Sequence, residues 1–185
     1  MKKTLLFVIL LGMLTLGLQA VKIDLGLLFS TRSVSDPEIQ DVYGSGAVYF
    51  PYAAVNVWQG LCFGLGYEGG YNRDGKIGLY QEDSNLKVGG LELFAAYRFD
   101  FGKLSPYAKL GIGSYSYEQV VSGATKVDDK KTALSLAAGL RFYATRCLFL
   151  AAELKYVPLK VNPLGEEVDL SGMRFGAGIG YTFNL

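Results

Sequence analysis

The chain has 185 residues and a net charge of +1, with 50% hydrophobic, 14% aromatic and 19% charged residues. This length fits a single domain, and the near-neutral charge disfavours a nucleic-acid-binding surface. The sequence has no histidine, which removes the commonest general base and most zinc sites. Glycine contributes 24 residues, nearly double its usual share of ~7%. This excess, beside 13 Tyr and 11 Phe, points to β-structure.

The first twenty residues have the layout of a secretory signal peptide. A start with two lysines precedes an apolar run from Leu5 to Leu18, and the small residue Ala20 lies at the expected cleavage point. The run is shorter than the ~20 residues that a membrane-spanning helix needs. We therefore predict that residues 1–20 are removed on export and that residues 21–185 form the mature domain, with 16 basic and 17 acidic residues.

From Val21 onward, hydrophobic residues recur at every second position, which is typical of strands with one apolar and one polar face. In the last segment, an apolar row from Met173 to Leu185 alternates with glycine, hydroxyl, amide and one arginine. Eight strands are predicted, at residues 22–30, 43–55, 61–71, 91–99, 105–117, 134–142, 148–156 and 173–185. In the second of them both faces are apolar or small, and Pro51 predicts a bulge or a local bend because proline cannot donate to the sheet ladder.

The connections between the predicted strands alternate in length. Long polar stretches that read as loops cover Thr31–Val42, Asn72–Asn85, Glu118–Lys131 and Pro158–Asp169. Short turns are expected at Asn56–Gly60, Asp100–Leu104 and Thr145–Arg146. All long connections then lie at one end of the sheet and all short ones at the other, which is the asymmetry of an outer-membrane barrel.

Side-chain volume favours a membrane barrel over a soluble one. An eight-stranded barrel encloses only enough space for side chains or one small ligand, so rows of Leu, Phe, Tyr and Met fit better against lipid than inside. Closure also satisfies every backbone donor and acceptor in the bilayer. We therefore predict an all-β fold, an eight-stranded antiparallel transmembrane up-and-down β-barrel, with a lipocalin-like soluble barrel as the alternative. Aromatic girdles are expected from Trp58, Phe99, Phe142, Tyr181 and Phe183 at the turn end and from Tyr71, Tyr80, Tyr115 and Tyr117 at the loop end.

The N-terminal signal, the eight alternating strands and the C-terminal sequence GYTFNL from Gly180 to Leu185 resemble the small OmpA/OmpX-type outer-membrane β-barrel family. The resemblance covers essentially the whole mature chain. It implies location in the outer membrane of a Gram-negative bacterium and insertion by the barrel-assembly machinery, which reads a terminal aromatic residue in this family. This chain departs from that pattern by ending in Leu185, with Phe183 two residues earlier in the same phase.

Charged residues on the predicted inner face form the main candidate site. They are Lys22, Asp24, Glu68, Glu92, Arg98, Lys109, Arg141, Glu153, Lys155 and Arg174. Four acids and six bases should pair there, because an unpaired buried charge costs several kcal/mol. Forked hydrogen bonds are expected from Arg98, Arg141 and Arg174 to Glu92 or Glu153. We interpret this network as a structural plug, and a gated polar path or a small-anion site is the alternative.

The two cysteines, Cys62 and Cys147, enter an oxidising compartment if the chain is exported, which raises the question of a disulfide. They fall on the third and seventh predicted strands, which lie opposite each other in an eight-stranded barrel. Cysteines whose Cα atoms are more than ~7 Å apart cannot be bridged without distortion. We therefore predict two free thiols.

The sequence favours a structural or surface-interaction role, in envelope integrity or in adhesion through the loops. A narrow porin-like channel or small-solute transporter is the alternative. A lipid A-modifying enzyme is the third hypothesis, but the catalytic histidine of such small barrels is absent, so we predict no enzyme, catalytic residue, cofactor or metal site. Expected partners are membrane lipids and lipopolysaccharide, which acidic loops can contact through divalent cations, and the chain is expected to be monomeric.

Overall fold

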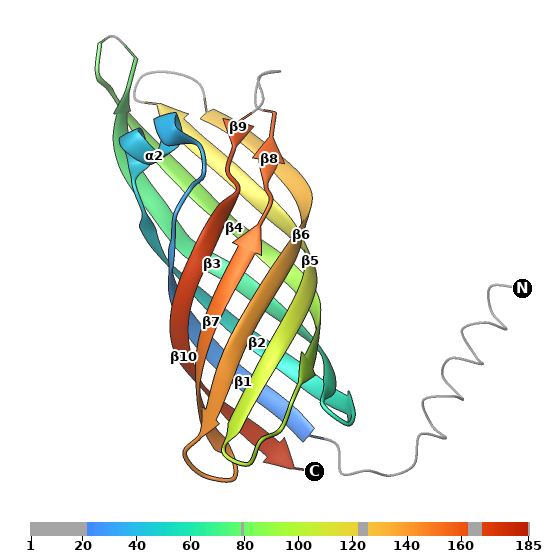
Figure 1. Cartoon of the computed structure of the whole chain (residues 1–185). Helices are drawn as coiled ribbons and strands as arrows, with labels where there is room; N and C mark the ends of the chain where they lie inside the picture. The colour runs from blue at the N-terminus through green and yellow to red at the C-terminus, as the bar shows by residue number, and fades with distance from the viewer. Residues whose placement is uncertain (1–21, 79, 122–125, 163–167, 185) are drawn as a thin grey trace, which may run out of the picture.

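The computed structural model describes residues 22–78, 80–121, 126–162 and 168–184. The predicted signal peptide at residues 1–20 lies outside these residues. Within them, eight antiparallel strands close into one barrel in the order β1-β10-β7-β6-β5-β4-β3-β2 (Figure 1). The barrel strands are β1 (Lys22–Arg32), β2 (Gly46–Trp58), β3 (Leu61–Ile77), β4 (Glu82–Arg98), β5 (Leu104–Val121), β6 (Lys126–Tyr143), β7 (Leu148–Val157) and β10 (Gly172–Asn184).

The barrel closes by pairing its first strand with its last. The β1–β10 ladder runs without a break from Lys22 opposite Asn184 to Arg32 opposite Arg174. Each of the other barrel strands pairs with the barrel strands that come directly before and after it along the chain. The predicted up-and-down, eight-stranded barrel is therefore confirmed. Among the described residues, no helix has the length and hydrophobicity required to cross a membrane.

The two ends of the barrel differ, and we name them by their connections. The turn end carries the tight β2–β3, β4–β5 and β6–β7 turns, with the start of β1 and the end of β10 (Figure 1). The loop end carries the helix α2 (Pro37–Tyr43) and the small two-stranded sheet of β8 (Lys160–Val161) and β9 (Val168–Asp169). At the β2–β3 turn, Gln59 and Gly60 both have positive φ, of 30° and 93°, which gives the tight reversal expected there.

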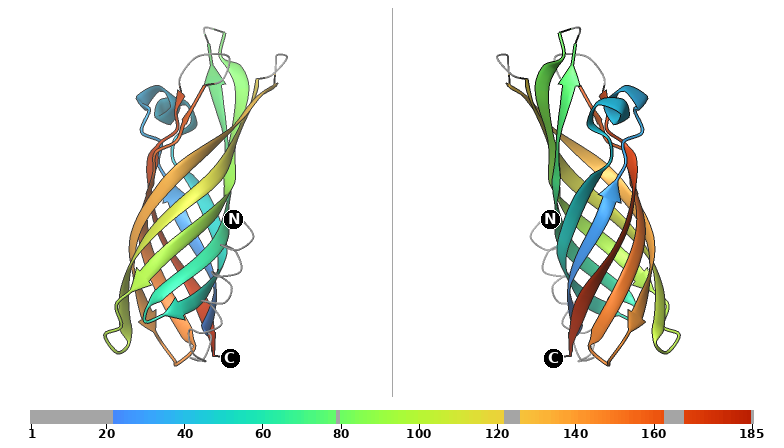
Figure 2. Two further views of the ribbon diagram at one scale, coloured as in Figure 1. Left: turned by 90° about the vertical axis from the view of Figure 1, so that its right-hand side faces the viewer. Right: turned by 90° about the vertical axis from the view of Figure 1, so that its left-hand side faces the viewer.

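Two predicted loops are largely strand. β3 continues to Ile77 and β4 begins at Glu82, so most of Asn72–Asn85 is a paired hairpin. Likewise β5 reaches Val121 and β6 begins at Lys126 within Glu118–Lys131. The sequence predicts loops in these polar segments because neither face is apolar enough to contact lipid. The structure differs because the strand pairing continues beyond the apolar outer surface. The four strands β3 to β6 rise farthest toward the loop end (Figure 2).

Of the bulge or local bend predicted at Pro51, the bulge does not occur. The β1–β2 register is continuous, with Pro51 opposite Leu27. On its other side, β2 pairs with β3 in one register before and after the proline, from Tyr49 opposite Gly69 to Tyr52 opposite Gly66. The missing donor of Pro51 therefore interrupts the ladder without displacing the strand.

The outer surface of the barrel carries exposed apolar side chains on every strand. They include Leu25, Val55, Phe63, Leu65, Leu91, Leu93, Leu110, Ile112, Leu134, Leu136, Leu150, Leu154 and Ile179. In water, so large and continuous an apolar surface would be a liability. Facing acyl chains, it is the surface expected of a transmembrane barrel. The five aromatic residues predicted for the turn-end girdle are all exposed on this surface.

The predicted girdle at the loop end is wrong for three of its four members. Tyr71, Tyr115 and Tyr117 are buried inside the barrel, and only Tyr80 is exposed. A register shift between Glu68 and Tyr71 turns Tyr71 inward. The other two share the inward phase of Lys109 on β5. The exposed aromatic residues nearer the loop end instead include Phe29, Tyr49, Tyr67, Tyr156 and Phe175.

The buried tyrosines belong to an apolar cluster that fills the barrel at the loop end, which we call the loop-end core. Its members are Val34, Tyr43, Val48, Tyr71, Leu86, Val88, Tyr115, Tyr117, Ala133, Val157, Leu159, Val161 and Leu170. On β4, the inward residues change from Leu86 and Val88 to Glu92, while the outward residues change from Lys87 to Leu91. Near the loop end the barrel therefore has an apolar interior and a polar exterior, as in a soluble protein. Closer to the turn end its exterior is apolar, as expected for contact with lipid.

Candidate functional site

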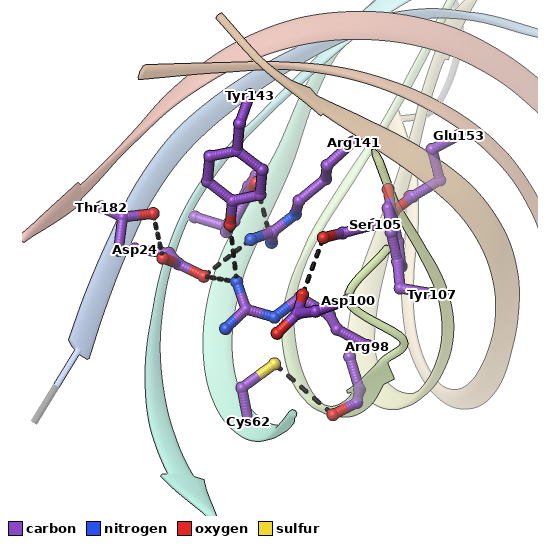
Figure 3. Close-up of polar contacts among 12 residues, drawn as sticks. Asp24, Cys62, Arg98, Asp100, Ser105, Tyr107, Arg141, Tyr143, Glu153 and Thr182 are labelled. Atoms are coloured by element: carbon purple, nitrogen blue, oxygen red, sulfur yellow. Dashed lines mark hydrogen bonds and ion pairs between the residues drawn. The ribbon is translucent and has the colours of Figure 1, made fainter. Parts of the chain in front are cut away.

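The charged residues of the inner face lie in three layers below the loop-end core. The layer nearest the turn end centres on Asp24, whose side chain is almost fully buried. Asp24 Oδ2 accepts from Arg98 Nη1 at 2.9 Å and from Arg141 Nη1 at 2.7 Å (Figure 3). Its second oxygen, Oδ1, accepts from Thr182 Oγ1 at 2.7 Å. One carboxylate from the first strand therefore holds two guanidinium groups from β4 and β6.

The middle layer pairs Lys109 of β5 with Glu153 of β7. Lys109 Nζ lies 2.7 Å from Glu153 Oε1 and 2.8 Å from Oε2. Tyr107 donates its hydroxyl to Glu153 Oε2 at 2.8 Å. The lysine also lies over two inward aromatic rings, with Nζ 4.9 Å from the Phe50 centroid and 5.2 Å from that of Phe94. Hydrogen bonds and cation–π contacts together compensate the buried ammonium group.

The third layer, under the loop-end core, joins three cations to two acids. Glu68 forms ion pairs with Arg174 and, at 3.6 Å between Nη1 and Oε1, with Arg32. Lys155 Nζ lies 2.6 Å from Glu92 Oε2 and 3.6 Å from Glu68 Oε2. Arg32 also donates from Nη2 to the backbone oxygen of Leu170 at 2.9 Å, which ties this layer to the last loop.

Glycines on the inner face create the room for these side chains. At Gly113, for example, an added Cβ would lie 2.7 Å from Tyr115 Cε2. The ring of Tyr115 occupies that space, and its hydroxyl donates to Glu92 Oε2 at 2.7 Å. The excess of glycine seen in the sequence thus makes space for large inward side chains.

The structure brings together all seven residues of the predicted network, but with other partners than expected. Those seven are Glu92, Arg98, Lys109, Arg141, Glu153, Lys155 and Arg174, and each is buried. The arginines Arg98 and Arg141 bind Asp24, not Glu92 or Glu153. Glu153 instead pairs with Lys109, and Glu92 pairs with Lys155. The predicted partners were wrong because the alternation of residues shows which face each side chain is on but not its position along the barrel axis.

Two residues at the ends of β1 differ from prediction. Lys22, expected inside, is exposed at the turn end. Arg32, assigned to a loop, is fully buried in the third layer. The signal for Arg32 was present, since it lies in the same phase as Asp24 and Ser30, two positions beyond the predicted end of the strand.

Between the charged layers, the lumen has little free space among its side chains. Beside Lys155 and Glu153 there is a cavity of about 20 Å³, and beside Arg141 and Tyr107 one of about 10 Å³. A single water molecule needs roughly 10–15 Å³. Among the described residues, the layers and the loop-end core therefore fill the barrel above its turn end, leaving space for one or two isolated waters.

The two cysteines are free thiols on opposite sides of the barrel. Cys62, near the start of β3, is buried and donates weakly from Sγ to the backbone oxygen of Ala96 at 3.5 Å (Figure 3). Cys147 lies just before β7 and is partly exposed. In the strand order, three strands separate β3 from β7 in either direction. This arrangement agrees with the predicted separation of the two cysteines.

The substitution Arg141→Leu should destabilise the barrel by about 1–3 kcal/mol, the cost of losing a hydrogen bond to a charged group. The loss is limited because Asp24 keeps its bonds to Arg98 and Thr182. Urea titration of the protein refolded in detergent micelles measures the change. An unchanged midpoint would contradict the pairing of these charges.

Comparisons with known proteins agree with this architecture. The model of the family described as "Outer membrane protein beta-barrel domain" matches residues 5–183. Comparison with curated proteins by sequence finds no match.

Among solved structures, Neisserial surface protein A has a TM-score of 0.62 at 16% identity, over 89% of this chain and 98% of that one. Ail of Yersinia pestis, in complex with the heparin analogue sucrose octasulfate, has a TM-score of 0.56 at 15% identity, over 90% and 100%. The N-terminal β-barrel domain of Pseudomonas aeruginosa OprF has a TM-score of 0.56 at 16% identity, over 86% and 97%. At these identities the likeness concerns the fold. The family match over nearly the whole chain, together with the closed barrel and its apolar outer surface, shows that the chain belongs to the outer membrane protein beta-barrel domain family and is an integral protein of the bacterial outer membrane.

Proposed function

We propose that the protein has a structural and surface-interaction role in the outer membrane, with its loop end outside the cell and its turn end in the periplasm. The observation that carries this proposal is the filled lumen, whose internal cavities measure only about 20 and 10 Å³. A barrel filled in this way supports passage of solutes poorly. Its outward-facing end is then the part available for binding.

The described part of the loop end supports a binding role because it is a fixed surface. Asp36 caps α2 by accepting from the backbone nitrogens of Glu38 and Ile39. Tyr43 is the last residue of α2. Its hydroxyl oxygen lies 2.7 Å from Ser84 Oγ and accepts a hydrogen bond from Gln119 Nε2 at 2.7 Å. Contacts between the first loop and β4 and β5 hold the surface together, so a partner meets it with little loss of conformational entropy.

The charge of the first loop favours one class of partner. Residues 33–45 contain three acids, Asp36, Glu38 and Asp41, and no lysine or arginine. Ail, which has the same fold, is described in complex with a sulfated heparin analogue, but acids repel such a polyanion. We propose that this loop contacts lipopolysaccharide phosphates through bridging divalent cations.

Conductance measurements test the filled lumen. The purified barrel in planar lipid bilayers should give no conductance steps, because the cavities between the charged layers, of about 20 and 10 Å³, are too small to form a continuous path. The double variant Lys109→Ala with Glu153→Ala, which empties the middle layer, serves as the matched comparison. Discrete steps from the unmodified protein would overturn the proposal in favour of a narrow channel.

A binding assay tests the surface role separately. The triple variant Asp36→Asn, Glu38→Gln and Asp41→Asn should bind lipopolysaccharide micelles several-fold more weakly in the presence of Mg²⁺, because the acids that would hold the cation are gone. The control is Asp100→Asn, which removes one acid at the turn end. Equal binding by the triple variant and the unmodified protein, or binding insensitive to a chelator, would contradict the cation bridge.

A further inference from the structure

At the turn end the barrel opens into a cavity of about 560 Å³, which we call the vestibule. It is lined by the end residues of β1 and β10, the β4–β5 and β6–β7 turns, and inward side chains of β4, β5 and β6. Its volume is in the range of sites that hold small organic molecules. Its lining shares Arg98 and Thr182 with the lumen plug, and it lies at the opposite end of the barrel from the loop surface.

The lining of the vestibule is strongly cationic. It includes Lys22, Lys103, Arg146 and the inner residue Arg98, against one acid, Asp100. Asp100 is itself engaged, since Ser105 donates from Oγ to Asp100 Oδ1 at 2.7 Å (Figure 3). Within the described part of the chain, Lys22, Lys103 and Arg146 have no acid within ion-pair distance. Three cations from separate elements therefore face this opening with their charges uncompensated.

The inner wall of the vestibule adds a buried positive charge. Asp24 neutralises only one of the two guanidinium groups that it binds, so the buried set of Asp24, Arg98 and Arg141 keeps a formal charge of +1. Arg98 has about 5% of its surface exposed, and its Nε has no hydrogen-bond partner. A buried, charged donor without a partner is costly, and Arg98 is the member of the set that lines the vestibule.

We propose that the vestibule is a binding site for a small phosphorylated anion entering from the turn end. Arg98 supplies a preoriented guanidinium at the inner wall, where arginine binds phosphate oxygens well. Lys103 and Arg146 on the two turns, with Lys22 on β1, supply the remaining positive charge at the opening. A group with more than one negative charge fits this set better than a single carboxylate, and the volume leaves space for a sugar-sized substituent. The site is independent of the proposed role of the loop end.

Calorimetric titration with inorganic pyrophosphate tests the site, on the barrel refolded in a detergent without phosphate. The expected result is saturable binding at one site per barrel that weakens as salt is added. The double variant Lys103→Gln with Arg146→Gln, which changes only exposed turn residues, should bind about tenfold more weakly. The control is Lys76→Gln with Lys130→Gln, which removes the same charge from exposed positions on β3 and β6 at the loop end, and it should bind like the unmodified protein.

Two outcomes would overturn the proposal: no saturable binding at millimolar pyrophosphate, or equal weakening in both double variants, which would indicate general attraction to a cationic surface. Faster migration of unboiled samples on a gel verifies that each variant is folded. A second arm identifies the source of the phosphate by repeating the titration in nanodiscs of phosphatidylglycerol or of phosphatidylcholine. Loss of pyrophosphate binding only in phosphatidylglycerol assigns the site to a lipid headgroup, and retention in both lipids assigns it to a free phosphate compound.

Discussion

Replacing Asp24 by asparagine should lower the free energy of unfolding by about 3–5 kcal/mol, the range for breaking a buried ion pair from one side. The variant Asp24→Asn keeps the size of the side chain but leaves Arg98 and Arg141 buried without their shared anion. Its effect should exceed that of Arg141→Leu, which removes one of two cations and leaves the carboxylate paired. Urea unfolding in detergent micelles gives both values.

The matched control for this prediction is Glu118→Gln. Glu118 pairs with Lys126 at 3.3 Å between Oε2 and Nζ, but Glu118 is partly exposed and Lys126 is exposed, so the loss should be at most about 1 kcal/mol. Equal effects of Asp24→Asn and Glu118→Gln would show that burial does not amplify the Asp24 interactions. A smaller effect for Asp24→Asn than for Arg141→Leu would contradict the central position of the carboxylate.

The second large effect is expected at the seam between β1 and β10. An alanine at Gly178 would place its Cβ against the backbone oxygen of Leu27 and 2.8 Å from Leu28 Cα. Backbone atoms of a paired strand cannot rotate away as a side chain can. The variant Gly178→Ala should therefore lose about 1–3 kcal/mol, as expected for overpacking, and a larger residue should lose more.

Gly78→Asn is the control for the seam. Gly78 has a φ of 73° and no atom within 4 Å of an added Cβ, and asparagine tolerates this backbone conformation. Its unfolding free energy should stay within about ±0.5 kcal/mol of the unmodified protein. If Gly178→Ala were equally neutral, the seam would have to open easily, contrary to its unbroken register.

The sequence predicted the barrel well because lipid imposes a simple rule on it. Outward residues such as Leu93 and Ile112 are apolar, inward ones alternate with them and include glycines, charged residues such as Glu92 and aromatic rings, and both sets follow a period of two. The rule fails where the barrel leaves the lipid. Tyr71 was assigned to the outer face because its bulge leaves no mark in the alternation, and Arg32 was assigned to a loop because its neighbours are polar.

The partners within the lumen could not be predicted for a different reason. Alternation places Arg98 and Asp24 on the inner face, but their contact depends on the stagger of strands that are far apart in the sequence. If one strand shifts by two residues against its neighbour, every side chain stays on the same face of the sheet but acquires different cross-strand partners. The sequence does not predict the vestibule because two of its cations, Lys103 and Arg146, lie in turns, where no periodic pattern links them to Lys22 and Arg98.

The loop-end core has a consequence for the order of assembly. Its side chains come from early and late parts of the barrel sequence, with Val34 and Tyr43 in the first loop and Leu159 and Leu170 between β7 and the last strand. These residues cannot be packed until the first strand has met the last. In a partly inserted barrel, the residues of the loop-end core would therefore remain unpacked while the strands enter the bilayer. The packing of that core is coupled to the closing of the barrel, and its free energy becomes available only once the chain is complete.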